Sequence, residues 1–161
     1  MKNLTNFQKQ FKNKTVLVTG HTGFKGSWLT LWLESLGSKV VGVALDPASI
    51  PSHFEVAEFS AILEDHRLDI RNCDAIKNLV AQTQPDFVFH LAAQALVKQS
   101  YEDPVLTYQT NAIGTLNLLE GLRLLKKKCS AVMITSDKCY NNVEWVWGYR
   151  ETDELGGIDP Y

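Results

Sequence analysis

The sequence has few cysteines, no recognisable set of metal ligands and no long hydrophobic run. Its three cysteines, Cys73, Cys129 and Cys139, are an odd number without metal-site spacing, and the four histidines form no ligand pattern. We therefore expect reduced thiols, no bound metal and a cytoplasmic location. No segment approaches the roughly 18 apolar residues that cross a bilayer, and the polar first residues lack the core of a signal peptide.

The sequence also lacks an excess of charge of one sign. It has 16 lysines and arginines against 18 aspartates and glutamates, a net charge of −2, so nothing favours nucleic acid or a membrane as a partner. With 161 residues, 45% of them hydrophobic, the chain is long enough for one globular domain.

The most informative stretch is a glycine-rich turn between a strand and a helix. The β-branched run at 15–19 predicts a buried strand, and an apolar stripe predicts a helix at 24–36. Between them, Gly20, Gly23 and Gly26 follow the spacing G-x-x-G-x-x-G. Gly20 would allow the tight turn, Gly23 the approach of backbone N–H groups to phosphate, and Gly26 close helix–strand packing. This arrangement predicts dinucleotide binding of the short-chain dehydrogenase type.

The rest of the chain alternates between strands and helices. Further strands are predicted at 39–45, 66–70, 87–91 and 131–135, and further helices at 73–82 and 104–128. This alternation predicts an α/β fold over residues 1–161, an incomplete Rossmann-type, doubly wound parallel sheet of about five strands. Trp28 and Trp32 lie on the apolar stripe of the first helix, and we expect both in the core.

The adenosine ribose of the cofactor needs an acid at the end of the second strand. Asp46, 20 residues after Gly26, suits that role, although as a turn former before Pro47 it has an equally good structural explanation. No lysine or arginine lies between Ala44 and Ser52 to meet the 2′-phosphate of NADP. The sequence therefore favours NAD.

Other candidate cofactor contacts lie in the glycine-rich turn and at the later strand ends. Asp69 and Ile70 are placed to reach the adenine, and the small residues after the fourth strand let a cofactor pass close to the backbone. Lys25 is more simply explained as a solvated side chain, although a cation there would favour phosphate. The full set comprises Gly20, His21, Gly23, Phe24, Lys25, Gly26, Asp46, Asp69, Ile70, Leu91, Ala92, Ala93 and Thr135.

Five blocks of the sequence recur together in one known family. They are GHTGFKGSWL at 20–29, HLAAQ at 90–94, SYEDP at 100–104, TSDKCY at 135–140 and EWVWGYRE at 144–151. From about residue 11 to its end, the chain resembles the CDP-glucose 4,6-dehydratases, a family of NAD-dependent extended short-chain dehydrogenases/reductases. The glycine-rich turn identifies only the superfamily, whereas the last two blocks are far more specific.

The resemblance implies conversion of CDP-glucose to CDP-4-keto-6-deoxyglucose and water, a lyase step in deoxysugar and O-antigen biosynthesis. In such enzymes NAD takes hydride from C4 of the glucosyl ring, and the 4-ketone acidifies the C5 proton. Water is then eliminated across C5 and C6, and the same hydride returns to C6. NAD is regenerated, so the net reaction is a dehydration.

The resemblance also implies roles for four residues. Ser136 would hydrogen-bond the sugar O4, Asp137 would protonate the departing C6 hydroxyl, and Tyr161 would remove the O4 proton. Lys138 stands where related dehydratases carry a glutamate as C5 base, and it either acts as that base or only hydrogen-bonds cofactor or substrate. If the Asp137 and Lys138 side chains touch, each favours the charged form of the other, against the needs of acid–base catalysis. A plain surface salt bridge is the remaining explanation.

The chain ends at Tyr161. The lysine that the family carries four residues later, the remaining strands and the nucleotide-sugar domain fall outside it, so we expect the isolated chain to be inactive. The family also implies a homo-oligomer. Two alternatives are another extended sugar-nucleotide epimerase or reductase, which would not need the pair Asp137 and Lys138, and a non-catalytic nucleotide-binding fragment.

Overall fold

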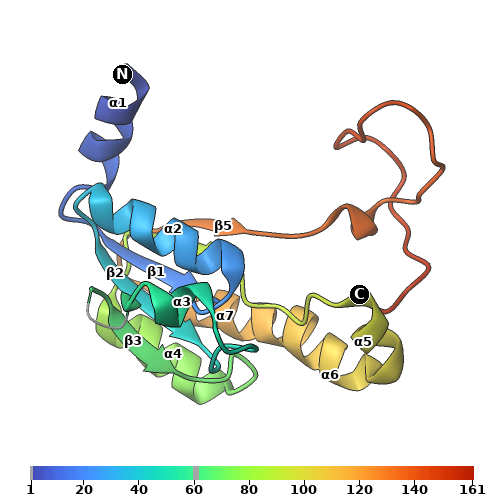
Figure 1. Cartoon of the computed structure of the whole chain (residues 1–161), viewed down its shortest axis with the longest axis horizontal. Coiled ribbons are helices and arrows are strands. Elements are labelled where there is room, and N and C mark those ends of the chain that lie inside the picture. Colours follow the sequence, from blue (N-terminus) through green and yellow to red (C-terminus); the bar gives the residue numbers. More distant parts are fainter. Residues whose placement is uncertain (1, 60–61) are drawn as a thin grey trace.

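The computed structural model describes residues 2–59 and 62–161, and within them five parallel strands form one sheet (Figure 1). The strand order is β3-β2-β1-β4-β5. The chain adds β2 and β3 on one side of β1 and then crosses over to add β4 and β5 on the other side. The strands are β1 (Thr15–Thr19), β2 (Lys39–Ala44), β3 (Glu64–Arg67), β4 (Phe87–His90) and β5 (Ser130–Met133). The predicted doubly wound α/β sheet is confirmed.

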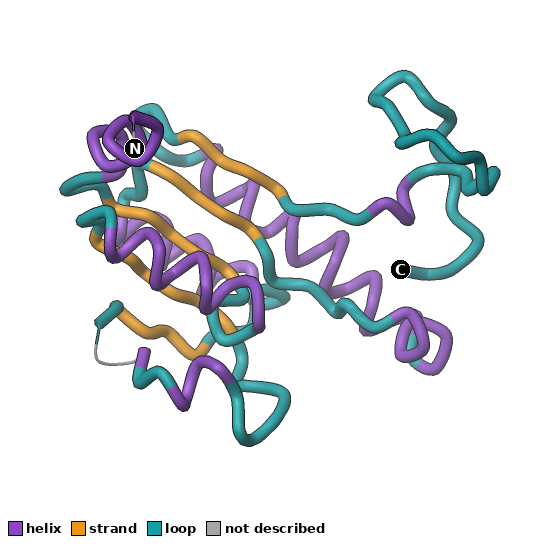
Figure 2. The backbone as a smooth tube through the Cα atoms, turned by 45° about the horizontal axis from the view of Figure 1, so that its top comes forward, coloured by secondary structure: helices purple, strands orange, loops and turns teal. Residues whose placement is uncertain are grey.

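The helical elements are α1 (Lys2–Phe11), α2 (Phe24–Ser35), α3 (His53–Val56), α4 (Cys73–Thr83), α5 (Val97–Glu102), α6 (Pro104–Tyr108), the π-helical turn η2 (Gln109–Ile113), α7 (Gly114–Arg123) and the 3₁₀ turn η3 (Asp137–Cys139). Helices pack on both faces of the sheet, α1 and α2 on one face and α4 and α7 on the other (Figure 2). The sequence analysis did not predict α1, α3 or α5.

The alternation of side chains along β1 builds two cores, one on each face of the sheet. Leu17 joins the cluster under α4 and α7, whereas Val16 and Val18 join the cluster with Phe11 of α1 and Leu33 of α2. Because successive strand residues point to opposite faces, an almost wholly apolar strand must be buried on both sides. All of β1 after Thr15 is buried.

Two predicted elements differ from the structure. The third strand was expected at 66–70, but β3 spans Glu64–Arg67. It pairs with β2, and its last residue lies opposite Ala44. Leu68 and Ile70 suggested a later strand because they are apolar, but they pack on the core after the strand has ended. The helix expected at 104–128 is interrupted by the π-turn η2 and ends at Arg123.

The expectation that both tryptophans of α2 lie in the core was wrong. Trp28 is 51% exposed and Trp32 is 42% exposed. The face of α2 that meets the sheet carries small residues instead, with Gly26, Ser27 and Thr30 buried beside Leu33. Small residues let the helix approach the strands closely, which leaves the large aromatic rings on the outer side. Trp28 stacks there on the ring of His53 at a centroid distance of 4.3 Å.

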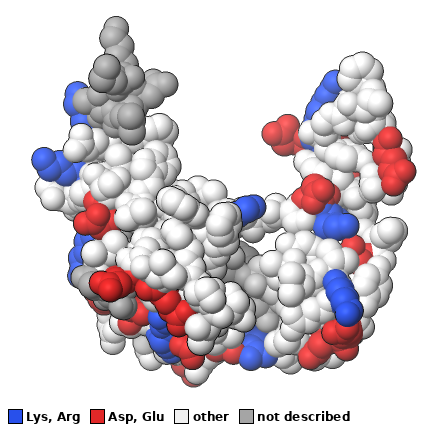
Figure 3. Space-filling view, viewed as in Figure 1, with Lys and Arg blue, Asp and Glu red and all other residues white. Residues whose placement is uncertain are grey.

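Residues 134–161 leave the sheet as an extended segment, the C-terminal arm, and none of them is fully buried. The arm folds on itself through a bridge between Tyr140 and Leu155, and Figure 3 shows the molecule hollowed between the arm and the body of the sheet. Its end returns toward α5, where the Tyr101 hydroxyl donates to the Ile158 carbonyl at 3.3 Å. Among the described residues, no helix has both the length and the apolar character needed to span a bilayer.

Candidate cofactor and active site

Two of the three glycines of the turn after β1, Gly20 and Gly26, occupy places that a larger residue could not. Gly20 has φ +73°, and a Cβ there would lie 2.8 Å from the Ala92 nitrogen. A Cβ on Gly26 would overlap the Gly20 carbonyl. Gly23 is the N-cap of α2 and supplies no side-chain acceptor, so the N–H groups of the first helical turn remain free to meet a phosphate. The turn therefore fits a dinucleotide pyrophosphate.

The side chains of this turn point in different directions. Phe24 and Lys25 are exposed on the first turn of α2, but His21 is fully buried. Its Nε2 lies 2.9 Å from Asp65 Oδ1, and its ring fills the space above Gly42 of β2. Burial lowers the pKa of His21, although Asp65 opposes that shift, so the ring is neutral and Nε2 carries the proton donated to Asp65. The backbone of His21 belongs to the predicted phosphate loop, whereas its side chain reaches β3.

A buried chain of hydrogen bonds joins β1, β4 and the helix behind them. Thr19 Oγ1 accepts hydrogen bonds from the N–H groups of Leu91 and Ala92, each at 3.0 Å, and lies 2.6 Å from His90 Nδ1. His90 Nε2 lies 2.9 Å from Thr115 Oγ1. Burial lowers the pKa of His90 to about 4, so the ring is neutral and can donate from Nε2.

This chain of hydrogen bonds fixes the backbone at Leu91 and Ala92, where the sequence predicts that a cofactor passes. The sequence analysis missed Thr19 and His90 as contributors. The sequence did contain a signal for them, because each is a polar residue at the carboxyl end of a buried strand. The parallel register of β1 and β4 places Thr19 opposite His90.

The predicted adenosine-binding residues lie beyond the ends of β2 and β3. Asp46 is 90% exposed, and its Oδ1 lies 3.6 Å from a guanidinium nitrogen of Arg67. Hydrogen bonds from Arg71 lower the pKa of Asp69. Ile70 is buried, with its side chain against Gly114 of α7. Asp46 and Asp69 are therefore accessible to a ligand at this edge of the sheet, whereas Ile70 could contact one only through its backbone. The contacts of all three residues with a cofactor stay predictions.

The candidate catalytic residues begin directly after β5, where Thr135 is exposed and Ser136 caps the turn η3. Ser136 Oγ donates to Asp137 Oδ1 at 3.1 Å and accepts from the Lys138 N–H at 3.1 Å. The turn follows the pairing of β4 with β5, which the Ile134 N–H extends to the His90 carbonyl. These residues therefore stand at the same edge of the sheet as the glycine-rich turn.

Asp159, which the sequence analysis overlooked, connects two of the candidate catalytic residues. Its carboxylate is 6% exposed, with Oδ2 at 3.6 Å from Lys138 Nζ and Oδ1 accepting the Tyr161 N–H at 3.0 Å. Lys138 is thus paired with Asp159 rather than with Asp137. No periodicity marked this residue, because it lies in a loop.

A family model described as GDP-mannose 4,6 dehydratase matches residues 17–161. Among curated proteins, CDP-glucose 4,6-dehydratase of Salmonella typhimurium is 52% identical over 151 residues, which are 94% of this chain and 42% of that protein. The chain therefore spans less than half the length of that relative.

Solved structures agree with this similarity. An epimerase from Methanothermobacter thermautotrophicus superimposes with a TM-score of 0.81 and 26% identity, over 98% of this chain and 46% of that one. UDP-glucose 4-epimerase of Thermus thermophilus, solved as a complex with NAD, has a TM-score of 0.76 and 31% identity, over 91% of this chain and 46% of that one. In both cases the chain matches somewhat less than half of the solved protein.

Proposed function

The chain belongs to the GDP-mannose 4,6-dehydratase family, and from this premise we propose that it forms the NAD-binding and catalytic-turn part of a CDP-glucose 4,6-dehydratase. The observation that supports the proposal is the pair formed by Lys138 and the nearly buried carboxylate of Asp159, which also accepts the backbone N–H of Tyr161. Ser136 lies beside Lys138 in the turn after β5 and accepts its N–H. The 52% identity to a CDP-glucose 4,6-dehydratase supports this substrate over the other sugar nucleotides named among its relatives.

The cofactor would be held at the carboxyl edge of the sheet. The uncapped N–H groups at the start of α2 would bind its pyrophosphate, and Asp46 would accept hydrogen bonds from the adenosine ribose. The backbone of Ala92 and Ala93 would border the part that leads to the nicotinamide. When bound, NAD supplies a reversible hydride acceptor for C4 of the sugar and donor for C6.

The residues of the arm would move protons. Ser136 Oγ would turn from Asp137 to hydrogen-bond the sugar O4, and the Tyr161 hydroxyl, as phenolate, would take the O4 proton. Lys138 in its neutral form would remove the proton from C5 and return it to C5 when C6 is reduced. Protonated Asp137 would donate to the C6 oxygen as it leaves as water. Since Lys138 contacts Asp159 in the structure, substrate must displace that ion pair before Lys138 reaches C5.

The test is the conversion of CDP-glucose carrying deuterium at C4 by the protein translated from the whole reading frame. We expect a product that has lost one water and carries deuterium at C6. Ser136→Ala and Lys138→Met should each lower turnover by about 100-fold, the usual scale of acid–base contributions. Lys128→Met, which removes an exposed lysine outside the site, is the matched control and should leave turnover unchanged.

Two results would replace the proposal. A product of unchanged mass, epimerised at a ring carbon, would make the protein an epimerase. Dehydration of UDP-glucose or GDP-mannose in preference to CDP-glucose would keep the reaction but reassign the substrate.

A further inference from the structure

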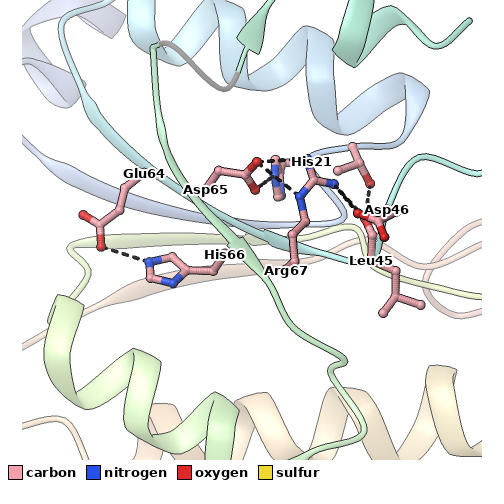
Figure 4. A network of polar contacts seen from close by, with 8 residues as sticks. His21, Leu45, Asp46, Glu64, Asp65, His66 and Arg67 are labelled. Carbon is pink, nitrogen blue, oxygen red and sulfur yellow. Dashed lines mark hydrogen bonds and ion pairs between the residues drawn. The ribbon is translucent and has the colours of Figure 1, made fainter.

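An arginine that is distant in sequence from Asp46 stands beside it in the fold. β3 pairs with β2 so that Arg67 lies opposite Ala44, the last residue of β2. Its guanidinium then reaches over the end of β2, with one nitrogen donating to the Leu45 carbonyl at 3.2 Å and lying 3.6 Å from Asp46 Oδ1 (Figure 4). The segment 44–52 contains no cation of its own, but the neighbouring strand supplies one.

Arg67 is held in place independently of Asp46. Its Nε and a second terminal nitrogen donate to Asp65 Oδ2 at 3.2 and 2.9 Å, and its guanidinium carbon lies 4.9 Å above the ring of Phe54. The other oxygen of Asp65 is bound to His21, which is neutral and adds no second positive charge. Arg67 therefore keeps its position when Asp46 moves.

Asp46 is held much less firmly. Its side chain is 90% exposed, and the 3.6 Å approach to Arg67 is its one ion pair among the residues that the structure describes. A carboxylate in this position can rotate into solvent at little cost, because exposed ion pairs contribute only about 0–1 kcal/mol. The terminal nitrogen of Arg67 would then face the space that Asp46 had occupied.

We propose that Arg67 gives this edge of the sheet two modes of ribose recognition, so that it accepts NADP as well as NAD. With Asp46 turned inward, its carboxylate binds the 2′-hydroxyl of NAD; with Asp46 turned outward, Arg67 binds the 2′-phosphate of NADP. An acid selects the hydroxyl and an arginine the phosphate at this point of Rossmann folds, and here both are present. The proposal rests on the proposed function only in placing a dinucleotide at this site.

The charges set the order of the two affinities. Asp46 and Asp65 carry two negative charges against one on Arg67, so the wild-type protein should bind NAD more tightly than NADP, by about tenfold. Asp46→Asn removes one negative charge and should reverse that order. A charge-assisted contact between guanidinium and phosphate contributes at least a factor of about ten, so Arg67→Gln should weaken NADP binding by that amount or more.

The experiment is the calorimetric titration of NAD and NADP into the protein translated from the whole reading frame. This measurement of binding needs no turnover. We expect Arg67→Gln to weaken NADP at least tenfold and to change the affinity for NAD less than threefold. Arg123→Gln is the matched control, because Arg123 is also paired with an acid, Glu120 at 2.8 Å, but lies at the end of α7. It should change neither affinity. If Arg67→Gln does not fold, Arg67→Lys, which keeps the charge without the fork of nitrogens, is held to the same criterion of selective NADP loss.

The outcomes separate this inference from the proposed function. NAD binding with no NADP binding in either the wild type or Asp46→Asn would overturn the inference and leave the NAD site standing, as would an equal effect of Arg67→Gln on both cofactors. Binding of neither dinucleotide would overturn both.

Discussion

The polar groups at the ends of β1 and β4 are buried and bonded to distant parts of the chain. Those of the C-terminal arm, apart from the Asp159 carboxylate, are mostly exposed and bonded to near neighbours. Thr19 and His90, 71 residues apart, share a hydrogen bond at 2.6 Å and are both almost inaccessible. In the arm, Ser136 bonds to Asp137 and Lys138. The first region is thus held by buried contacts, as the proposed cofactor site requires, and the second is exposed and free to rearrange, as the proposed substrate contacts require.

The largest expected difference in stability between the two regions comes from replacing one glycine by alanine in each of them. Gly26→Ala should lower the free energy of unfolding by more than about 3 kcal/mol, because the new Cβ would collide with the Gly20 carbonyl, a backbone atom that cannot yield. Gly148→Ala in the arm should change it by less than about 0.5 kcal/mol, because nothing lies within 4 Å of the added atom. Urea unfolding of both variants measures the difference, and equal stabilities would show that the two regions are held alike.

A second effect appears on acidification. His90 has a folded-state pKa of about 4 against 6.5 in the unfolded chain, so the unfolded state binds more protons between these values. Stability is therefore complete above pH 6.5 and is lost as the pH falls toward 4, by about 3 kcal/mol for this group. The lowered pKa of His21 acts in the same direction.

The measurement is urea unfolding of the wild type and of His90→Gln at pH values from 7 to 4. The variant should show a shallower loss of stability with acid, because it lacks the titrating ring. An unchanged slope in His90→Gln would mean that this buried ring does not control the acid response.

The same contrast explains how far the sequence alone could lead. Periodicity predicted the glycine-rich frame, since β1 and α2 matched within a residue of their predicted ends. It misplaced β3, because that strand takes its limits from pairing with β2 rather than from its own polar residues. It also misjudged Trp28 and Trp32, because small residues on the opposite face of α2 determine which side packs.

The contacts of the site depend on residues brought together from separate elements, which spacing does not reveal. Arg67 reaches Asp46 only because β3 lies beside β2, so counting charges between 44 and 52 missed it. Asp159 contacts Lys138 only through the folding of the arm, for which the sequence carries motifs but no periodicity. The resemblance named Ser136, Asp137, Lys138 and Tyr161 as the catalytic set; the partners that position them required the structure.

The smallest expected effects come from removing one hydroxyl in each region. Thr19→Val keeps the shape of the side chain but leaves the Ala92 N–H and His90 Nδ1 without their buried partner, and it should cost about 2 kcal/mol of stability. The Leu91 N–H keeps a bond to the Thr19 carbonyl. Ser136→Ala loses contacts only to its neighbours in the turn and should cost less than about 0.5 kcal/mol.

The effect of these two substitutions on activity should not follow their effect on stability. Ser136→Ala should remain as stable as the wild type yet lose turnover, because the proposed mechanism uses its hydroxyl to bind the sugar O4. Thr19→Val should instead lose affinity for the proposed cofactor as it loses stability. Urea unfolding, dinucleotide titration and the turnover of CDP-glucose, measured on both proteins, give the comparison. A Ser136→Ala protein as destabilised as Thr19→Val would mean that the turn after β5 is held as firmly as the ends of β1 and β4. Ser136 would then stabilise the fold, and a loss of turnover would not identify it as a residue that contacts substrate.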